Sequence, residues 1–593
     1  MRAEYCQSGG GTRASAARVV LKFGSSVLKS ARDLCAVVTE IYSNHREGRK
    51  IVAVVSAFEG ETDALIGLAR EAGADAQSRH APRLIALGEE KSAALLAIAC
   101  EAAGLDARVL GSRALSLRAT GAIDDAEPAG VDADLLHREI ERRDVVIVPG
   151  FVALGRLGEP VLLGRGGSDL TAVFLSSALG LSEAVLLKDV DGVYDCDPAA
   201  FGARARRYGE IDFATARRVA GQLLQKKAID FGERHGVAVK VGRLNSAFAT
   251  RVGKYGSPPR PEEPAAALKV AIAGLGTIGK GAALRLAGAG ADYRLAAALV
   301  ANAAKPRAAA LSATECFEDA SDLLALAPDV VVDALPSGES GRALTRAALA
   351  TGISVITANK QAIAGSLRDL TALAKANGAT LWWSAAVGGG APIVETLRRA
   401  RTAAPVERIE AILNGSVNFI LTALAGGENF ENAVALAQEA GFAEPDPRAD
   451  LSGADVKAKL AILSFDAFDE EIPVAEISAE ALTEERAAQM INAGGQWRQI
   501  ARLRRNPGGA LAASVAFERC DDDPLFSQTR HEGNAARIYV DGGRVFVARG
   551  KGAGRKPTVE SLLGDLGALK RARSVDAGKA AAPAPLQESE CVG

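Results

Sequence analysis

Short apolar runs alternate with longer Ala- and Leu-rich stretches along most of this chain. The runs are rich in Val and Ile, which is typical of strands buried on both faces, and the stretches between them have helical spacing. In the first half the runs are Val19–Phe23, Ile51–Ser56, Val145–Pro149, Ala184–Leu187 and Val237–Val241. The same alternation restarts at Lys269–Ala273. Strands separated by helices predict parallel sheets covered by helices, so we expect α/β domains in series.

A proline-rich segment divides the chain into two halves. Ser257–Ala267 contains four prolines within eight residues, and proline continues neither a helix nor a central strand. We therefore place a linker at residues 251–267, after a first domain at 18–250. Residues 1–17 are polar and Gly/Ser-rich, and residues 573–593 are Ala/Pro-rich. Neither segment has a helical or strand period, so both are expected to be disordered tails.

The composition narrows the class of protein. The chain has 593 residues, 48% of them apolar and 24% charged, with a net charge of −2. This length predicts several compact units, and the balanced charge gives no reason to expect nucleic acid or an anionic membrane as a partner. The seven cysteines have no metal-ligand spacing, which favours free thiols in a reducing cytoplasm. No apolar run is long enough to span a membrane.

A dinucleotide-binding fingerprint follows the strand at Lys269–Ala273. The pattern GxGxxG is weak alone, but here a strand, the pattern and a helix stand in the required order. The first glycine permits a tight turn, the second lets the backbone approach a pyrophosphate, and the third allows close packing of helix on strand. The residues of this turn are Gly274, Gly276, Thr277, Ile278 and Gly279.

Polar residues follow the next strands of the same predicted sheet. The strand at Arg294–Val300 ends without the acidic residue that holds an NAD ribose, and Lys305 and Arg307 lie just beyond it. We therefore prefer NADP over NAD, although two basic loop residues are often only solvated charge. Two further strands lead to Pro336-Ser337 and to Lys360. Such strand ends face the cofactor crevice of an open α/β sheet.

The segment Gly441–Lys459 combines carboxylates and lysines between two apolar segments. We expect Ser452 to cap a helix that begins at Ala454. Asp455 and Lys459 then lie one turn apart on the same helix face. An isolated pair of this kind is usually an exposed salt bridge.

Five motifs in order give the C-terminal half a specific likeness: Thr357–Lys360, Val387–Pro392, Ile412–Leu421, Gly441–Lys459 and Gly533–Thr558. Over residues 268–570 the chain resembles homoserine dehydrogenase. The resemblance implies a Rossmann cofactor domain at 268–385, an α+β substrate and dimerisation domain at 386–530, and a return segment at 531–572. It also implies NAD(P)-dependent interconversion of aspartate β-semialdehyde and homoserine by a cytoplasmic homodimer or higher oligomer.

The resemblance assigns roles to matching positions. Asp455 and Lys459 would be the polar pair at the reacting carbon, with Lys360 beside the nicotinamide. The implied substrate-binding residues are Gly415, Ser416, Glu444, Asp450 and Asp455. The family also binds a sodium or potassium ion through backbone oxygens, here those of Val387 and Gly389. Since Ser384 stands where the family has a carboxylate, we expect weaker dependence on that cation.

The N-terminal half resembles aspartokinase of the amino-acid kinase family over residues 18–250. The likeness is carried by Lys22–Val27, Leu87–Ser92, Leu163–Asp169 and Lys188–Pro198. It implies an α/β sandwich that transfers a phosphoryl group from ATP, with Mg²⁺, to the β-carboxylate of aspartate. Lys22 would stabilise that phosphoryl group, and Asp189 would contact the nucleotide. The implied aspartate-binding residues are Ser56, Glu89, Arg165 and Asp169.

This half also departs from the family pattern. Ser25 adds a Cβ where backbone should approach phosphate, and Gln222 replaces a nucleotide-contacting lysine. The chain leaves no room near the linker for regulatory domains, so we expect little feedback by threonine or lysine. An active kinase and a catalytically weak scaffold beside a working dehydrogenase both remain open. A non-enzymatic NADP sensor is a third possibility, which Asp455 and Lys459 in their context disfavour.

Overall fold

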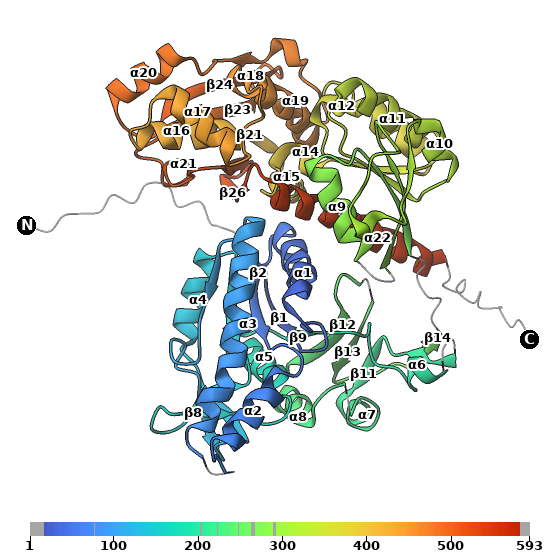
Figure 1. The fold of residues 1–593 in the computed structure, drawn as a ribbon, viewed down its shortest axis with the longest axis vertical. Helices are drawn as coiled ribbons and strands as arrows, with labels where there is room; N and C mark the ends of the chain where they lie inside the picture. The colour runs from blue at the N-terminus through green and yellow to red at the C-terminus, as the bar shows by residue number, and fades with distance from the viewer. Residues whose placement is uncertain are drawn as a thin grey trace, which may run out of the picture.

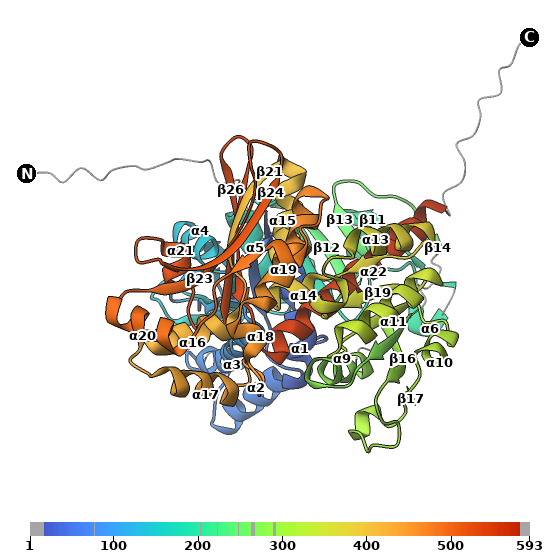
Figure 2. The same cartoon turned by 90° about the horizontal axis from the view of Figure 1, so that it is seen from above.

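The computed structural model describes residues 17–75, 78–201, 204–221, 223–246, 248–261, 267–288 and 292–580. The predicted disordered tails lie outside these ranges, apart from Ala17 and residues 573–580. Figure 1 shows an N-terminal half in blue and green and a C-terminal half in green to red, with helix α22 (Arg555–Ala580) lying near their contact. Figure 2, seen from above, separates the two parts of the C-terminal half, with β21 and β24 on one side and α9 and β16 on the other.

An eight-stranded, mainly parallel sheet forms the N-terminal half. Its order is β11 (Glu210–Asp212), β13 (Ala249–Gly253), β12 (Ala238–Arg243), β9 (Glu183–Lys188), β1 (Arg18–Phe23), β2 (Lys50–Val55), β6 (Val145–Pro149) and β3 (Ala107–Val109). Successive residues of a strand face opposite sides. In β1, Leu21 and Phe23 pack with helices α1 (Leu34–Arg46) and α3 (Ala81–Ala103). Val20 faces α4 (Ala133–Arg142), α5 (Gly167–Ala178) and α8 (Lys226–His235). This half is therefore an α/β sandwich.

A second parallel sheet begins after the linker. Its order is β17 (Glu315–Phe317), β16 (Tyr293–Leu299), β15 (Leu268–Ala273), β18 (Val330–Asp333), β19 (Ser354–Thr357) and β20 (Leu381–Trp382). Counted along the chain, this is the order 3-2-1-4-5-6 of a Rossmann domain. Helix α9 (Thr277–Ala287) follows β15, so the fingerprint lies at the turn where the order reverses.

The third sheet is mainly antiparallel. Its order is β22 (Ser478–Ala479), β24 (Leu511–Arg519), β23 (Trp497–Arg505), β21 (Val406–Ile412), β25 (Gly533–Val540) and β26 (Arg544–Lys551). Helix α19 (Ala454–Phe468) and helix α15 (Ile393–Ala403) pack their apolar side chains on it, in one core with Leu503 and Ile538. The overall class is thus α/β, with an α/β sandwich, a Rossmann domain and an α+β domain in series.

The chain returns to the cofactor domain through α22. Val559, Leu562, Leu566 and Leu569 join the core formed by β15, β18 and α9. The helix continues to Ala580, so the predicted end of this segment at residue 572 falls inside a helix. The predicted domain end at residue 250 likewise falls inside β13. Each of these two positions therefore lies within a regular element that continues past the local change in composition.

The predicted linker, residues 251–267, overlaps the end of β13 and, among its described residues, includes a further short strand. Strand β14 (Arg260–Pro261) pairs antiparallel with β10 (Arg206–Arg207) at a sheet edge, where proline is tolerated. Within the described ranges, none of the helices has the length and apolar character needed to cross a bilayer.

Candidate active sites

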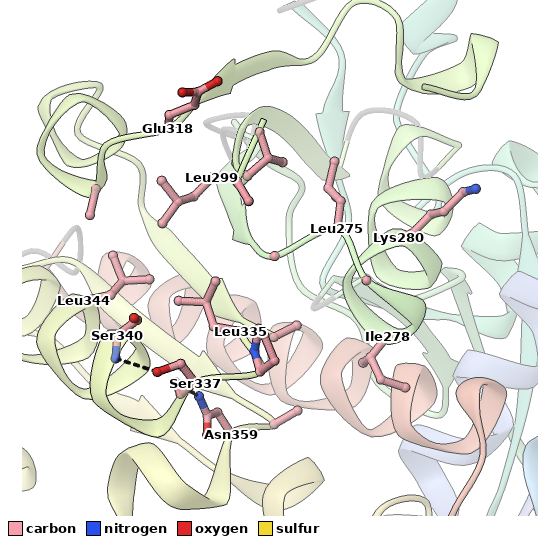
Figure 3. Close-up of a pocket in the computed structure, with 18 of the residues that line it drawn as sticks. Leu275, Ile278, Lys280, Leu299, Glu318, Leu335, Ser337, Ser340, Leu344 and Asn359 are labelled. Atoms are coloured by element: carbon pink, nitrogen blue, oxygen red, sulfur yellow. Dashed lines mark hydrogen bonds between the residues drawn. The ribbon is translucent and has the colours of Figure 1, made fainter. Parts of the chain in front are cut away.

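A cleft of about 1670 Å³ lies at the carboxyl ends of the Rossmann strands. It brings together most of the predicted cofactor-binding residues, which follow the ends of four strands, β15, β16, β18 and β19, or begin α9. They are Gly274, Gly276, Thr277, Ile278, Lys305, Arg307, Pro336, Ser337 and Lys360. Figure 3 shows Ile278, Leu335, Ser337 and Asn359 on one side of this cleft and Glu318 on the other. The cleft also reaches Glu444, so it extends from the Rossmann domain to the α+β domain that follows it.

The fingerprint glycines are required by the backbone. Gly274 has φ +88°, which side chains other than glycine rarely adopt. A Cβ on Gly279 would lie 1.8 Å from the carbonyl oxygen of Gly274. Gly279 therefore acts through close packing and does not line the cleft, whereas Gly276 caps α9 with open space before it. The free N–H groups at this helix start suit a phosphate group.

The loop after β16 holds both predicted basic residues at the cleft. Arg307 donates hydrogen bonds to the carbonyl oxygens of Ala303 and Lys305, each at 2.7 Å. Glu318 accepts a hydrogen bond from the Ala303 backbone N–H at 2.7 Å and also lines the cleft. Sequence reasoning missed this carboxylate. It follows the short strand β17, which the apolar pattern did not reveal.

A buried carboxylate lies beneath the cleft. Asp333 ends β18 and accepts hydrogen bonds from the Thr357 hydroxyl and the Leu335 N–H, each at 3.0 Å. Burial raises the pKa of Asp333 to about 6. Asn359 donates to the Ser337 carbonyl oxygen at 2.9 Å, and Ser337 caps helix α11 (Gly338–Ala350). These bonds join the ends of β18 and β19, so they fix the cofactor side of the site.

Two lysines hold one carboxylate where the cleft meets the second domain. The Asp455 carboxylate lies 2.9 Å from Lys360 Nζ and 2.7 Å from Lys459 Nζ. Lys459 also donates to the Leu413 carbonyl oxygen at 2.7 Å. Burial opposes ionisation of Asp455, yet the two ammonium groups hold its pKa well below the usual range. Asp455 in turn raises the pKa of Lys360. The exposed salt bridge considered from sequence is excluded, because Asp455 and Lys459 are both buried.

The other predicted substrate residues surround this group. Asp450 accepts a hydrogen bond from Asn414 Nδ2 at 3.1 Å, and burial together with the charge of Asp455 raises the pKa of Asp450. Gly415 and Ser416 begin helix α16 (Gly415–Ala425), and Ser416 Oγ donates to the Phe442 carbonyl oxygen at 2.5 Å. Glu444 is exposed at the cleft.

The predicted cap of the Asp455 helix was wrong. Helix α19 does begin at Ala454, but its N-cap is Gly453, with φ +77°. A short helix, α18 (Arg448–Leu451), precedes it, and the chain needs a left-handed residue to turn from one helix into the next. Ser452 belongs to that turn as the C-cap of α18, so it ends the helix before the one that it was expected to begin.

The predicted cation-binding backbone belongs to a tight glycine loop. Val387 lies in α14 (Ser384–Gly388), and Gly389 follows with φ +62°. A Cβ on Gly389 would lie 2.6 Å from the Gly552 carbonyl oxygen. Among the described residues no group of three or more His, Cys, Asp or Glu side chains is arranged to hold a metal ion.

The N-terminal half also holds a buried carboxylate between two lysines. Asp169 Oδ1 lies 2.7 Å from Lys22 Nζ, and Asp169 Oδ2 lies 2.9 Å from Lys188 Nζ. Burial lowers the pKa of Lys22 to about 8. Burial opposes ionisation of Asp169, but both lysines lower its pKa below the usual value. Lys188 was not assigned from sequence, although it ends β9 next to the strand that carries Lys22.

The other residues predicted for the kinase reaction differ in how exposed they are. Glu89 is buried and accepts a hydrogen bond from the Ala57 N–H at 3.3 Å, next to Ser56 at the end of β2. Burial raises the pKa of Glu89 to about 7. Arg165 and Asp189 are exposed; Asp189 follows Lys188, and Arg165 lies four residues before Asp169. Gln222 lies outside the described residues.

Three known protein domains match consecutive parts of the chain. Residues 17–242 match the amino acid kinase family. Residues 274–383 match the NAD-binding domain of homoserine dehydrogenase, and residues 392–566 match the homoserine dehydrogenase domain. The boundary at residues 383–392 falls between the second and third sheets, whereas the first match ends inside β12 and the second begins just after β15.

Characterised relatives resemble one half each. An NAD(+)-dependent homoserine dehydrogenase of Pseudomonas canavaninivorans is 34% identical over 234 residues, covering 39% of this chain and 66% of the relative. An aspartate kinase of Stutzerimonas stutzeri is 33% identical over 228 residues, covering 38% of this chain and 55% of the relative. The crystal structure of a homoserine dehydrogenase from Thiobacillus denitrificans aligns with a TM-score of 0.48 and 29% identity, over 53% of this chain and 76% of that one. The chain thus spans between about half and two thirds of the length of these two sequence relatives.

Proposed function

We infer that this chain, which joins an amino acid kinase family domain to the NAD-binding and homoserine dehydrogenase domains, is a bifunctional enzyme of aspartate metabolism. Its C-terminal half would reduce L-aspartate 4-semialdehyde to L-homoserine with NAD(P)H. Its N-terminal half would phosphorylate the β-carboxylate of L-aspartate with ATP. The observation that carries the first activity is Asp455 held between Lys360 and Lys459 at the inner end of the cofactor cleft.

The lysine pair suits reduction of an aldehyde. Bound NAD(P)H supplies a hydride to the carbonyl carbon, so negative charge develops on the carbonyl oxygen. An ammonium group stabilises this charge and donates the proton that completes the alcohol. We propose Lys459 as the donor. Asp455 orients both lysines and raises the pKa of Lys360, which keeps that second ammonium group charged beside the site. Asp450 and Glu444 would bind the substrate ammonium group, with Gly415 and Ser416 lining the same site.

The buried cluster of the N-terminal half supports phosphoryl transfer. Lys22 and Lys188 place two positive groups beside Asp169, at the ends of adjacent parallel strands. We propose that Lys22 stabilises the transferring phosphoryl group of ATP, with Mg²⁺ supplying further positive charge. Ser56, Glu89, Arg165 and Asp169 would bind aspartate, and Asp189 the nucleotide.

A second candidate for this half is a scaffold without kinase activity. Ser25 favours it, because its side chain adds bulk to the strand–helix turn that would face phosphate. Against it, the cluster of Lys22, Asp169 and Lys188 costs desolvation of three charges, which a domain that only supports the dehydrogenase has no need to bury.

Several finer points belong to the same proposal. We propose NADP as the preferred cofactor, because Lys305 and Arg307 line the cleft beyond β16. A monovalent cation would bind the backbone oxygens near Val387 and Gly389. We propose that the kinase-family, cofactor-binding and substrate domains work together in a cytoplasmic homodimer or higher oligomer.

The test measures both reactions on the same purified full-length chain. ATP consumption with aspartate, trapped as the hydroxamate by hydroxylamine, reports the kinase, and NADPH oxidation with aspartate semialdehyde reports the dehydrogenase. A kinase signal that disappears in Lys22→Ala would support two activities. NADPH oxidation without any kinase signal would leave the scaffold alternative, and the absence of NADPH oxidation would refute the dehydrogenase.

A further inference from the structure

Helix α1 of the N-terminal half docks onto the dehydrogenase half. Tyr42 donates a hydrogen bond to the Gly390 carbonyl oxygen at 3.1 Å, and the pair is buried. Arg46 lies one turn further along the same face and is 4% exposed. Figure 1 shows α1 next to α9, α15 and α22. One helix of the kinase-family domain therefore reaches into the other half of the molecule.

Arg46 is the centre of this contact. Its Nη2 lies 2.5 Å from Asp565 Oδ1 and 2.6 Å from Glu395 Oε1, and it donates to Ser384 Oγ at 3.1 Å. The Ser384 N–H and hydroxyl also donate to Asp565, at 3.2 and 2.9 Å. A guanidinium from one domain thus ties together three elements of the other, α14, α15 and α22.

The dehydrogenase half is built to receive this side chain. Gly564 lies inside α22, where glycine destabilises a helix relative to alanine. A Cβ at this position would lie 2.2 Å from Arg46 Nη1. On the opposite side, Arg399 of α15 donates to the Arg46 carbonyl oxygen at 2.5 Å. The space and the charge both fit an arginine from α1.

The elements that Arg46 ties together also hold the helix that carries the candidate catalytic residues. Trp383 Nε1 donates to Asp466 Oδ2 at 2.6 Å, and Arg398 Nε donates to Asp466 Oδ1 at 3.1 Å. Asp466 belongs to α19, as do Asp455 and Lys459. Residues 383–398 therefore contact Arg46 on one side and α19 on the other.

Helix α1 also contacts α9, the helix that follows the dinucleotide-binding fingerprint. Arg285, in the last turn of α9, donates to the Thr39 hydroxyl at 2.5 Å and to the Cys35 carbonyl oxygen at 2.6 Å. Both acceptors lie on α1. Helix α1 thus contacts α9, at the proposed cofactor site, and also α14 and α15, which hold the helix of the proposed substrate site.

We propose that helix α1 is a structural part of the dehydrogenase, and that Arg46 is a positioning residue for its reaction. The inference rests on the proposed reduction of an aldehyde by the C-terminal half. Arg46 fixes α14 and α15. Trp383, which adjoins α14, and Arg398 of α15 then set the position of α19 and thereby of Lys459. Small displacements of a reacting group cost up to about 100-fold in rate. Dehydrogenation then requires the N-terminal domain whether or not that domain phosphorylates aspartate.

The experiment compares Arg46→Met, Arg46→Lys and Arg49→Met in the full-length chain. Arg49 lies three residues further along, and its side chain pairs with Asn44 and Glu47 of its own half, so it is the matched control. We expect kcat for NADPH-dependent reduction to fall about 10- to 100-fold in Arg46→Met. The KM for NADPH should change less than threefold, Arg46→Lys should recover part of the rate, and Arg49→Met should match the wild type.

Hydrogen exchange separates positioning from a general loss of stability. In Arg46→Met, amides of 384–395 and 454–468 should exchange faster while those of β1 and β2 keep their protection. Unchanged kcat, or unchanged exchange in 454–468, would overturn the proposal. Should Arg46→Met fold poorly, the double variant Arg46→Met/Asp565→Asn removes the charge of Asp565, the more deeply buried of the two carboxylates that lose Arg46, and the same two criteria apply to it. Wild-type protein without NADPH oxidation would refute the dehydrogenase, and the exchange data would still decide the role of Arg46.

Discussion

The assignment of Lys459 can be tested by Lys459→Met. Methionine has a similar length and keeps the apolar contacts of the side chain, but it removes the ammonium group that lies 2.7 Å from both Asp455 and the Leu413 carbonyl oxygen. Asp455 keeps Lys360 as a partner at 2.9 Å, so its charge does not become unpaired. The variant therefore isolates the loss of one donor at the site.

The expected loss in rate is large compared with the expected loss in stability. A single donor aimed at a developing oxyanion contributes about 3–4 kcal/mol, which corresponds to a fall in kcat of roughly 100- to 1000-fold. The Leu413 carbonyl oxygen loses its charged donor, which costs about 1–3 kcal/mol of folding stability. Asp455→Ala should destabilise the fold more, by about 3–5 kcal/mol, because it leaves the buried Lys459 and the half-buried Lys360 without their carboxylate.

The assay is NADPH oxidation with aspartate semialdehyde under saturating conditions, with NADPH binding followed by fluorescence titration. Lys457→Met is the matched control, because Lys457 lies on the same helix and is only partly buried. NADPH should bind to all variants with wild-type affinity. Retention of wild-type kcat by both Lys459→Met and Asp455→Ala would refute the proposed roles of the two residues.

Other predictions follow from burial and charge elsewhere. The pKa of Glu89 is raised from 4.5 to about 7, so its contribution to stability is complete below about pH 4.5 and is lost as the pH rises through 7. Urea unfolding of the N-terminal half should therefore lose on the order of 3 kcal/mol across this range, and Glu89→Gln should abolish that loss. Replacing Lys305 and Arg307 by alanine should raise the KM for NADPH about tenfold and leave that for NADH unchanged; equal effects on both cofactors would exclude recognition of the 2′-phosphate. Removal of sodium and potassium should lower dehydrogenase turnover less than twofold, whereas its collapse would show that a cation at Val387 and Gly389 is essential. Threonine and lysine at millimolar concentration should leave both activities unchanged, and inhibition by either would contradict the expected lack of feedback.

Local patterns predicted the parts of the molecule that local physics determines. The strand, glycine turn and helix around Gly274 form a compact unit, so their order in the sequence was enough to predict the turn. The start of α19 at Ala454 was predictable because helical spacing begins there. The N-cap residue of α19 could not be predicted, because the left-handed backbone of Gly453 is required by the short helix α18 that precedes it.

Contacts between distant segments could not be predicted in this way. Arg46 ends a helix and is followed by charged residues, so the sequence pattern suggests a solvent-exposed position. Its partners are supplied by segments that are 338 and 519 residues away. Glu318 was missed for a related reason, because the strand before it is only three residues long and is defined by its pairing with β16. In both cases tertiary structure, and no local signal, sets the environment.

The position of α22 has a consequence for how the molecule is made. A ribosome completes the N-terminal half first, while Asp565, which Arg46 will bind, follows 519 residues later. At about 5–20 residues per second, the interval is roughly half a minute to nearly two minutes. Throughout this time Arg46 is exposed to water, where a guanidinium is well solvated and an equally large apolar side chain would promote aggregation. Because the contact is made by a charged side chain, the N-terminal half can stay soluble in the nascent chain until Asp565 has been synthesised.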